Sequence, residues 1–493
     1  MCVDMAGRAE ELGVIDDAGG LAKQVDRLRG QRTSVLNFKV FAVVFALAGS
    51  GLAAQQSVNV PLDQASSVAA QALVAGDAAL ALQIAEAVLV QRPDDRTALI
   101  VIAAAAPRLG DAARGRAAGA RAFAVSQSDA QKYEAARLTA LAAANDQRYT
   151  LATFWLRRAL TVAPNEQERN RTLNDARGVT RLNPWSTNLS FSLAPSNNVN
   201  GGAEDEASTA PGNPTGTLSA DAQAIAGWRA VLAFNTSYRL HQSRESRTTV
   251  GAQYRATRVR ITDDIDIPDE TFTTDYYELS LRHERALENG TLTLRAARAL
   301  YSYRDLDGPS GAQVLNDEQY DIWRLGIDRR VPLNAQTALS FSVGREWQEY
   351  QNRGIGEVNR VTLGTGFVHQ LASRDRIGGN ITLVDSKGDS VNYTSQDLTL
   401  SGNYRWAEPM GPITLGLGGG FRWSDYPDYN LLFAVTGGRQ DRTVFANADI
   451  GFPEISYAGF TPGLRIDASR TDSNVSRFDR TSFSASLTIS SQF

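Results

Sequence analysis

Residues that could act as bases, nucleophiles or metal ligands are few in this chain of 493 residues. It has three histidines, His241, His283 and His369, and one cysteine, Cys2. Acid–base catalysis needs such a side chain within hydrogen-bond reach of a reacting group, and the strands assigned below scatter the three imidazoles. Neither a zinc-ligand spacing nor a Gly-Lys-Ser/Thr phosphate loop is present. We therefore expect no catalytic residues, no metal site and no cofactor, and we predict that the protein is not an enzyme.

The composition excludes two further classes of protein. A net charge of -4 gives no support for nucleic-acid binding, which requires a basic face. The absence of any run of eighteen apolar residues excludes a helical membrane protein. A transmembrane barrel is compatible with a mean hydropathy of -0.27, because its lumen is polar. The near-absence of cysteine suits an oxidising periplasm, although simple scarcity explains it equally well.

An apolar stretch near the start of the chain resembles the core of a secretory signal peptide. Residues 40–48 (VFAVVFALA) follow Arg32 and Lys39 and precede small residues, the order that a signal peptide requires. We expect cleavage after Ala53 or Ala54, and no lipid anchor, since no cysteine follows. Residues 1–31 contain several acids, which indicates either a start site assigned too early or an unusually long leader.

Alanine-rich segments with helical periodicity follow, over residues 62–182. Gly76-Asp77, Gly110-Asp111 and Asn145-Asp146 are turn pairs spaced 34 and then 35 residues apart, each lying between two apolar-periodic segments. We expect helices at 64–75, 78–90, 96–109, 112–125, 129–144 and 149–161, with Ala79, Ala81 and Ala85 at the helix crossings. Helical hairpins at this period resemble tetratricopeptide repeats. Such a stack offers a groove for a peptide, and a rigid spacer or plug is the alternative.

The last residues of the chain alternate between apolar and small polar side chains. Phe483, Ala485, Leu487, Ile489 and Phe493 share one parity, and serine or threonine occupies most of the other. Successive side chains of a strand point to opposite faces, so this strand has one apolar and one polar face. A soluble sandwich could use such a strand too. Its repetition over the preceding residues and the terminal aromatic instead predict a transmembrane barrel.

Fourteen strand-like segments fill the region from Trp185 onward. They are 186–193, 226–240, 246–260, 274–284, 290–303, 319–330, 336–349, 357–370, 374–386, 391–406, 412–424, 441–452, 459–470 and 481–493. An even number suits a closed antiparallel barrel of the bacterial type. Glycines at 416–420 fall inside a strand, where they ease bending.

The connections between these segments alternate in length, which predicts the orientation of the barrel. Residues 194–225, 304–318 and 425–440 are long connections, and 241–245, 331–335 and 453–458 are short. Outer-membrane barrels have short periplasmic turns and longer outer loops, so we expect both termini and the helices in the periplasm. Aromatic residues expected to form the membrane-interface girdles are Tyr276, Tyr277, Tyr301, Tyr303, Trp347, Trp406, Trp423 and Tyr426.

Arginines on the strands are expected to line the lumen. They include Arg255, Arg258, Arg260, Arg295, Arg298, Arg324 and Arg345. Fourteen strands about 4.8 Å apart and tilted by about 40° close to a diameter of about 28 Å, which leaves a lumen of about 15 Å. An extended polypeptide or a sugar chain can pass through such a lumen, and a folded protein cannot. The sequence thus predicts three parts: a leader and signal peptide (1–54), a periplasmic helical repeat domain (55–183) and a barrel (184–493).

This order of parts resembles the surface lipoprotein assembly modulator (Slam) family over essentially the whole mature chain. The resemblance is strongest at the domain junction, which contains Pro184, Trp185, Pro195, Asn197, Asn198 and Asn200. It continues in the final hairpin, from Gly463 through Ser473-Asn474 to Arg480.

The resemblance implies an outer-membrane translocon that moves lipoproteins or related secreted proteins to the cell surface. The repeats would engage the client or a periplasmic chaperone. Independently of the resemblance, the alternation and the aromatic end of the last strand predict that the barrel-assembly machinery recognises Phe493. We also expect the barrel to contact outer-membrane lipid.

Two other functions fit the same arrangement of domains. Exopolysaccharide export porins also join tetratricopeptide repeats to a barrel, usually with more repeats and a larger barrel. A passive or uptake porin with an added interaction domain is the third possibility. Neighbouring genes for a lipoprotein client or for a polysaccharide synthase would separate the first two.

Overall fold

The computed structural model describes residues 61–307, 314–351 and 354–491. The expected cleavage residues Ala53 and Ala54 and the terminal Phe493 lie outside the described residues. The chain forms two compact units, and the division falls between Asn183 and Pro184. In the described part of the chain, no helix is both long and apolar enough to cross a membrane.

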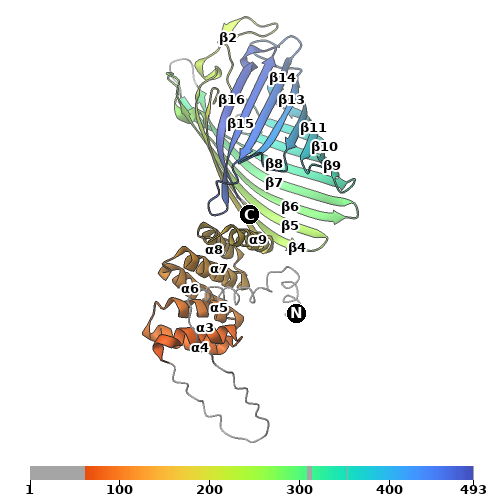
Figure 1. Cartoon of the computed structure of the whole chain (residues 1–493). Coiled ribbons are helices and arrows are strands. Elements are labelled where there is room, and N and C mark those ends of the chain that lie inside the picture. Colours follow the sequence, from red (N-terminus) through yellow and green to blue (C-terminus); the bar gives the residue numbers. More distant parts are fainter. Residues whose placement is uncertain (1–60, 308–313, 352–353, 492–493) are drawn as a thin grey trace. The chain divides into compact units, whose positions relative to one another are not determined.

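The first unit is a stack of antiparallel helices (Figure 1). The described residues of this unit form seven helices: α3 (Leu62–Val74), α4 (Ala78–Gln91), α5 (Arg96–Arg108), α6 (Ala112–Val125), α7 (Asp129–Asn145), α8 (Tyr149–Thr161) and α9 (Glu166–Leu182). Carboxylates of Asp77, Asp95 and Asp111 accept hydrogen bonds of 2.9–3.0 Å from the first turns of α4, α5 and α6. The six predicted helices are confirmed within a few residues at their ends.

Helix α9 is not among the helices that the sequence predicts. Its sequence is strongly polar, and it buries only Thr172, Leu173, Ala176 and Val179. Start signals were nevertheless present: Asn165 Oδ1 accepts a 2.9 Å hydrogen bond from the backbone of Glu168, and two acids lie in the first turn. Capping residues therefore marked a helix that apolar periodicity did not.

The third turn of the stack is not the predicted Asn145-Asp146 pair. Gly76 and Gly110 have φ angles of 90° and 87°, and the corresponding left-handed residue in the third turn is Gln147, at 56°. Asn145 ends α7 and Asp146 only caps it. The repeat is thus 34 residues once and longer the second time, because α7 is extended beyond the length of α5.

Small side chains let the helices approach closely. Ala81 and Ala85 are fully buried as expected, but Ala79 is exposed, because it faces away from the neighbouring helix. At Gly119 in α6, a methyl group would come within 2.2 Å of Thr139 Oγ1 in α7. Contacts of this kind hold α6 against its neighbours without large side chains.

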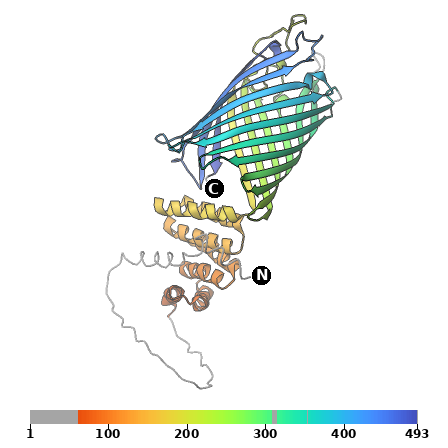
Figure 2. The same ribbon diagram turned by 90° about the vertical axis from the view of Figure 1, so that its right-hand side faces the viewer.

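The second unit is a closed antiparallel barrel, as predicted (Figure 2). Its fourteen strands are β1 (Trp185–Ser196), β4 (Gly227–Gln242), β5 (Ser246–Ile261), β6 (Thr274–Leu287), β7 (Gly290–Asp307), β8 (Val314–Pro332), β9 (Thr337–Tyr350), β10 (Glu357–Gln370), β11 (Arg376–Gly388), β12 (Ser395–Arg405), β13 (Thr414–Tyr426), β14 (Arg439–Gly451), β15 (Phe460–Ser473) and β16 (Arg480–Ser491). Each pairs with its sequence neighbours, and β16 returns to β1.

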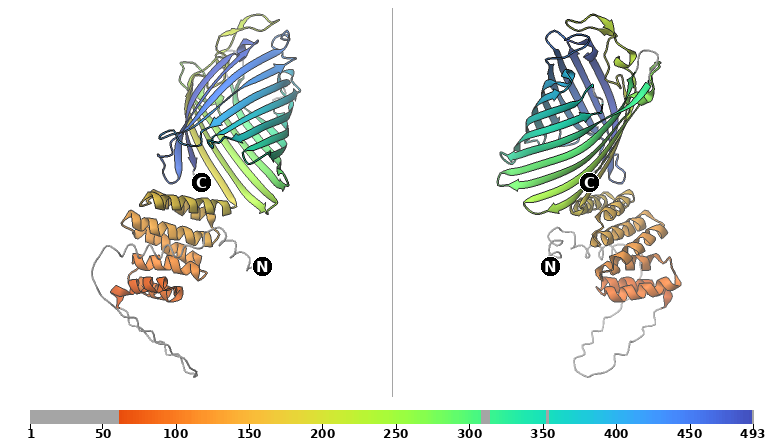
Figure 3. Two further views of the ribbon diagram at one scale, coloured as in Figure 1. Left: turned by 45° about the vertical axis from the view of Figure 1, so that its right-hand side comes forward. Right: turned by 180° about the vertical axis from the view of Figure 1, so that it is seen from behind.

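Long connections gather at one end of the barrel and short turns at the other (Figure 3). Residues 197–226, 262–273 and 427–438 lie at the long-loop end, whereas 243–245, 288–289 and 333–336 lie at the short-turn end. The first connection contains a small hairpin of β2 (Ala207–Ser208) and β3 (Gly216–Thr217). The expected loop 304–318 is largely strand, because β7 and β8 remain paired out to Asp307 and Val314.

Candidate functional site

The pairing register separates the two faces of the barrel wall. Partners in an antiparallel ladder point to the same side of a sheet, so Leu400, Phe421 and Val444 share one face and Thr399, Arg422 and Thr443 share the other. Large apolar side chains are half exposed on the first of these faces, as at Phe421 and Val444, each 51% exposed. That apolar face is the membrane-facing surface of a transmembrane barrel, and the opposite face lines the lumen.

Four of the arginines expected in the lumen lie on the outer face instead. The register places Arg258, Arg260, Arg298 and Arg345 on the parity of the apolar side chains, whereas Arg255, Arg295 and Arg324 point inward. Arg298 bonds to Asp321 at 3.1 Å and covers the Trp323 ring at 5.2 Å. Outward arginines paired with acids and indole rings are typical of the membrane interface, where their charged ends reach water.

A charged network occupies the lumen wall over β6 to β10. Arg324 donates to Glu278 at 2.7 Å and to Glu346 at 2.5 Å. Arg360 Nη1 lies 3.5 Å from Glu346 Oε1, and the side-chain amide of Gln348 donates a 2.5 Å hydrogen bond to the same oxygen. Arg295 and Asp328 form a further inward pair at 2.5 Å. This side of the lumen is therefore polar and carries charges of both signs.

Tyrosines expected in the interface girdle point into the lumen as well. The ring centres of Tyr301 and Tyr320 are 5.1 Å apart, and the Tyr320 ring stacks on the Tyr350 ring with 4.3 Å between their centres. The register also turns Tyr276, Tyr303 and Tyr426 inward, whereas Tyr277, Trp347 and Trp423 face outward as a girdle requires. Strand parity decides the face that an aromatic side chain occupies, and proximity to a strand end does not.

The asparagines of the junction motif fold the first long connection onto itself. Asn198 is only 2% exposed, and its side chain bonds to the carbonyl and the N–H of Gly202 at 2.8 and 2.9 Å. The Asn200 amide donates to the carbonyls of Asp221 and Gln223 and accepts from the N–H of Ile225. These side chains form hydrogen bonds to backbone N–H and C=O groups that have no partner in a strand ladder. The connection 197–226 is therefore an ordered structure.

Asn197 and the same connection also contact the last hairpin. Asn197 Oδ1 accepts a 2.9 Å hydrogen bond from the N–H of Phe483. Thr209 exchanges hydrogen bonds of 2.8 and 2.9 Å with Ser476. Nearby, the backbone carbonyl of Asp479 accepts a hydrogen bond from the N–H of Glu204. Burial raises the pKa of the Asp479 carboxyl group above its usual range. We call these contacts the clasp.

Two other motif residues, Pro184 and Trp185, lie at the short-turn end. The Pro184 carbonyl accepts a 2.9 Å hydrogen bond from the N–H of Arg239. Trp185 is half exposed, and its ring packs on Tyr238 at 4.8 Å. Pro195 lies at the far end of β1, opposite Trp228. The structure therefore divides the motif between the two ends of β1.

The three histidines lie on three different strands, β4, β6 and β10. His283 and His369 each contact a threonine hydroxyl, of Thr248 at 2.9 Å and of Thr337 at 2.8 Å. The register puts both rings on the outer face. The structure does not bring the histidines together.

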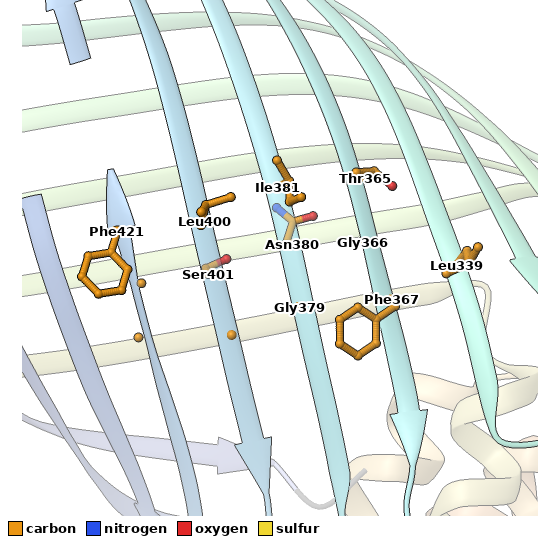
Figure 4. Close-up of a pocket in the computed structure, with 13 residues that line it drawn as sticks. Leu339, Thr365, Gly366, Phe367, Gly379, Asn380, Ile381, Leu400, Ser401 and Phe421 are labelled. Atoms are coloured by element: carbon orange, nitrogen blue, oxygen red, sulfur yellow. The ribbon is translucent and has the colours of Figure 1, made fainter. Parts of the chain in front are cut away.

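An apolar depression of about 660 Å³ lies on the outer wall over β9 to β13. Leu339, Phe367, Ile381, Leu400 and Phe421 surround it (Figure 4). Gly379, Gly402 and Gly419 are paired across neighbouring strands at its floor. The absence of side chains at these three positions therefore makes the wall thinner here, on its membrane-facing side.

The helical stack presents an aromatic patch on α6 and α8. The guanidinium of Arg158 lies 4.5 Å from the centre of the Phe123 ring, 5.6 Å from that of Phe154 and 5.2 Å from that of Trp155. Phe154 is 50% exposed, whereas Trp155 is nearly buried. Exposed apolar surface of this kind often marks a binding site. We name these four residues the aromatic patch.

Tyr133 is buried inside the stack, on α7. The hydroxyl of Tyr133, which is 2% exposed, lies 2.9 Å from both Glu168 Oε2 and Thr172 Oγ1. Burial, the largest cause, raises the pKa of Tyr133 to about 12. The nearby Arg137 guanidinium opposes that rise. This contact joins α7 to α9.

No protein-family model matches the chain, and no curated protein does. Among solved structures, a ferric enterobactin receptor mutant from Pseudomonas aeruginosa is 8% identical with a TM-score of 0.32, over 58% of this chain and 54% of the receptor. This chain therefore spans about half the length of that receptor. A loop-deletion mutant of OmpT, an outer membrane protein of Vibrio cholerae, is 7% identical over 62% of this chain and 99% of its own, with a TM-score of 0.31. A BenF-like porin from Pseudomonas fluorescens is 10% identical over 62% and 98%, with a TM-score of 0.30.

Proposed function

We propose that this protein is an outer-membrane translocon that delivers lipoproteins or related secreted proteins to the cell surface. The observation that carries the proposal is the union, in one chain, of a helical stack and a barrel with a polar lumen. A barrel alone is enough for passive diffusion. An added stack of helical hairpins supplies a surface that holds an extended chain. In this proposal the stack lies in the periplasm and resembles tetratricopeptide repeats in function as well as in shape.

The width of the barrel supports an unfolded client. Fourteen strands leave a lumen of about 15 Å, which admits an extended polypeptide but excludes a folded domain. A client must therefore be kept unfolded until it enters. The aromatic patch offers exposed ring surface and one guanidinium, which together suit an extended segment with apolar and acidic side chains.

The short junction between the units supports delivery in cis. Helix α9 ends at Leu182 and β1 begins at Trp185. A binding module on such a short tether has a high effective concentration near the barrel entrance. The stack would thus pass the client to the barrel without a separate diffusion step.

Deletion of residues 62–178 tests the proposal. The signal peptide and the barrel stay intact, so the barrel should assemble in normal amounts while the client no longer reaches the surface and accumulates in the periplasm or is degraded. Undiminished surface display after this deletion would show that the helices are only a spacer.

A pair of point variants sharpens the test. Phe154→Ala removes the most exposed ring of the aromatic patch, and Leu80→Ala removes an apolar side chain of similar exposure, 45%, from α4. We expect Phe154→Ala to lower display and Leu80→Ala to leave it unchanged. Equal effects of the two would argue against the patch as the client-binding surface.

Export of a polysaccharide is the second candidate, and the lumen-facing tyrosines favour it. Aromatic rings present flat apolar faces, and the run of Tyr301, Tyr320 and Tyr350 lies along the path of any cargo. If the deletion of 62–178 abolishes an exported polysaccharide and leaves surface proteins unaffected, this candidate replaces the first.

A further inference from the structure

Strand pairing is uneven around the barrel wall. Strand β1 pairs with β4 along its whole length, from Trp185 to Ser196. Strand β16 pairs with β15 in the same continuous way. Between β1 and β16, by contrast, ladder pairing among the described residues is confined to Ser196 and Ser484. The junction that closes the barrel is therefore its most weakly paired.

The single pair lies toward the long-loop end of the junction, where the clasp reinforces it. Besides the bond from Phe483 to Asn197, the Arg480 guanidinium donates to the carbonyl of Gly201 at 3.3 Å. From Ser196 back to residue 190, β1 extends about 20 Å at about 3.3 Å per residue, which covers about 15 Å of membrane at a tilt of about 40°. Beyond the Ser196–Ser484 pair, no ladder joins this stretch to β16 within the described residues. Proline within sheets is confined to edges and bulges, and Pro195 lies on this strand.

The two faces of the junction differ sharply in chemistry. Side chains facing the lumen are small and uncharged, namely Ser186, Asn188, Ser190 and Ser192 on β1 and Ser482, Ser484, Ser486 and Thr488 on β16. Side chains facing the membrane are large and apolar, including Leu189 at 61% exposure and Leu487 at 66%. The charged network lies on other strands, β6 to β10. A second charged cluster, Arg465 with Asp449 and Asp467, lines the lumen on β14 and β15 and borders the serines of β16. On its lumen side the junction therefore carries a row of these small polar side chains, most of them serines, which we call the serine track. On its other side the junction faces the membrane.

A cargo with both a polypeptide and acyl chains needs such a boundary. Acyl chains favour the bilayer with every buried methylene group, whereas an unfolded polypeptide needs the polar lumen to satisfy its backbone. A fully paired wall keeps the two apart. A wall that separates at one junction lets the acyl chains stay in the membrane while the attached peptide stays inside.

We propose that the β1–β16 junction is a lateral opening for lipidated clients. The strands separate along the stretch between the clasp and the short-turn end, and the lipid headgroup and the first residues of the client move along the serine track. This inference rests on the proposed function and narrows its substrate class to lipidated polypeptides.

A reversible crosslink tests the opening. Continuing the register from Ser196–Ser484 sets Ala194 opposite Ser486, so the pair Ala194→Cys and Ser486→Cys can be joined by a disulfide or a short cleavable thiol reagent in the full chain. The control pair, Ala446→Cys and Ala468→Cys, joins two residues that are already partners in the β14–β15 ladder. Heat-modifiable mobility verifies that both crosslinked barrels are assembled.

Two forms of one client are followed, one lipidated and one with its acylated cysteine removed. With the Ala194–Ser486 positions joined, display of the lipidated form should fall to background and return on reduction. The unlipidated form should still be released, and the control crosslink should affect neither. Undiminished display of the lipidated form, or equal loss of both forms, would overturn the lateral opening and leave the translocon intact. If the uncrosslinked protein displays neither client, the proposed function fails and the opening with it.

Discussion

Replacing Asn198 by alanine should loosen the first long connection of the barrel. The Asn198 side chain is almost fully buried and bonds to both backbone groups of Gly202. In Asn198→Ala the N–H of Gly202 retains a second acceptor, Asn200 Oδ1 at 3.3 Å, but its carbonyl loses this donor. The variant therefore leaves one buried backbone group, the Gly202 carbonyl, without this hydrogen bond.

The size of the effect follows from that one group. A buried polar group that loses its partner costs about 1–3 kcal/mol. If the lost hydrogen bond costs about 2 kcal/mol, the fraction of molecules in which the connection is open rises by about 30-fold. The change is local, because the strands of the barrel keep their own ladders.

Hydrogen exchange of the purified barrel, measured by mass spectrometry on peptides from 197–226, reports this opening. Amides bonded within the connection, such as those of Val199 and Ala203, should exchange faster by the same factor, since their exchange follows the open population. Asn430→Ala, an exposed asparagine of the 427–438 connection, is the matched control and should leave exchange unchanged. Wild-type exchange rates in Asn198→Ala would refute the reasoning.

Three further predictions concern assembly, orientation and pH. Deleting Phe493 should lower the amount of heat-modifiable barrel in outer membranes, because the final aromatic is expected to be read during capture of the edge strand; unchanged assembly would contradict this. A glutamyl endopeptidase added to intact cells should cut at the exposed Glu204 and Glu206 and spare the helices, whereas cleavage only after lysis would invert the orientation. The raised pKa of Tyr133 means that its contribution to stability is complete below about pH 10 and is lost as the pH rises towards about 12. Helicity of Tyr133→Phe, followed by circular dichroism, should therefore depend less on pH in this window; an identical dependence would exclude Tyr133 as its source.

The sequence predicted what depends on neighbours along the chain. Apolar periods of two and of about 3.6 residues located fourteen strands and six helices, because these patterns follow directly from backbone geometry. Gly76 and Gly110 marked their turns because a left-handed residue favours glycine. The same signal failed at Gln147, because glutamine rarely adopts the left-handed backbone conformation that it has here. Helix α9 was missed for a related reason, since it buries little and was marked by its cap alone.

Only the tertiary structure decided which side of the wall each side chain occupies and how the wall closes. Arg255 and Arg258 are three residues apart on one strand, so strand alternation alone puts them on opposite faces. The ladders to β4 and β6 decided that Arg255 is the one that lines the lumen. The pairing of Ser196 with Ser484 joins residues from opposite ends of the barrel domain, and no local pattern could reveal that few other pairs join these two strands within the described residues. The sequence by itself determined the elements, whereas the pairing of distant strands determined the lumen, the clasp and the weak junction.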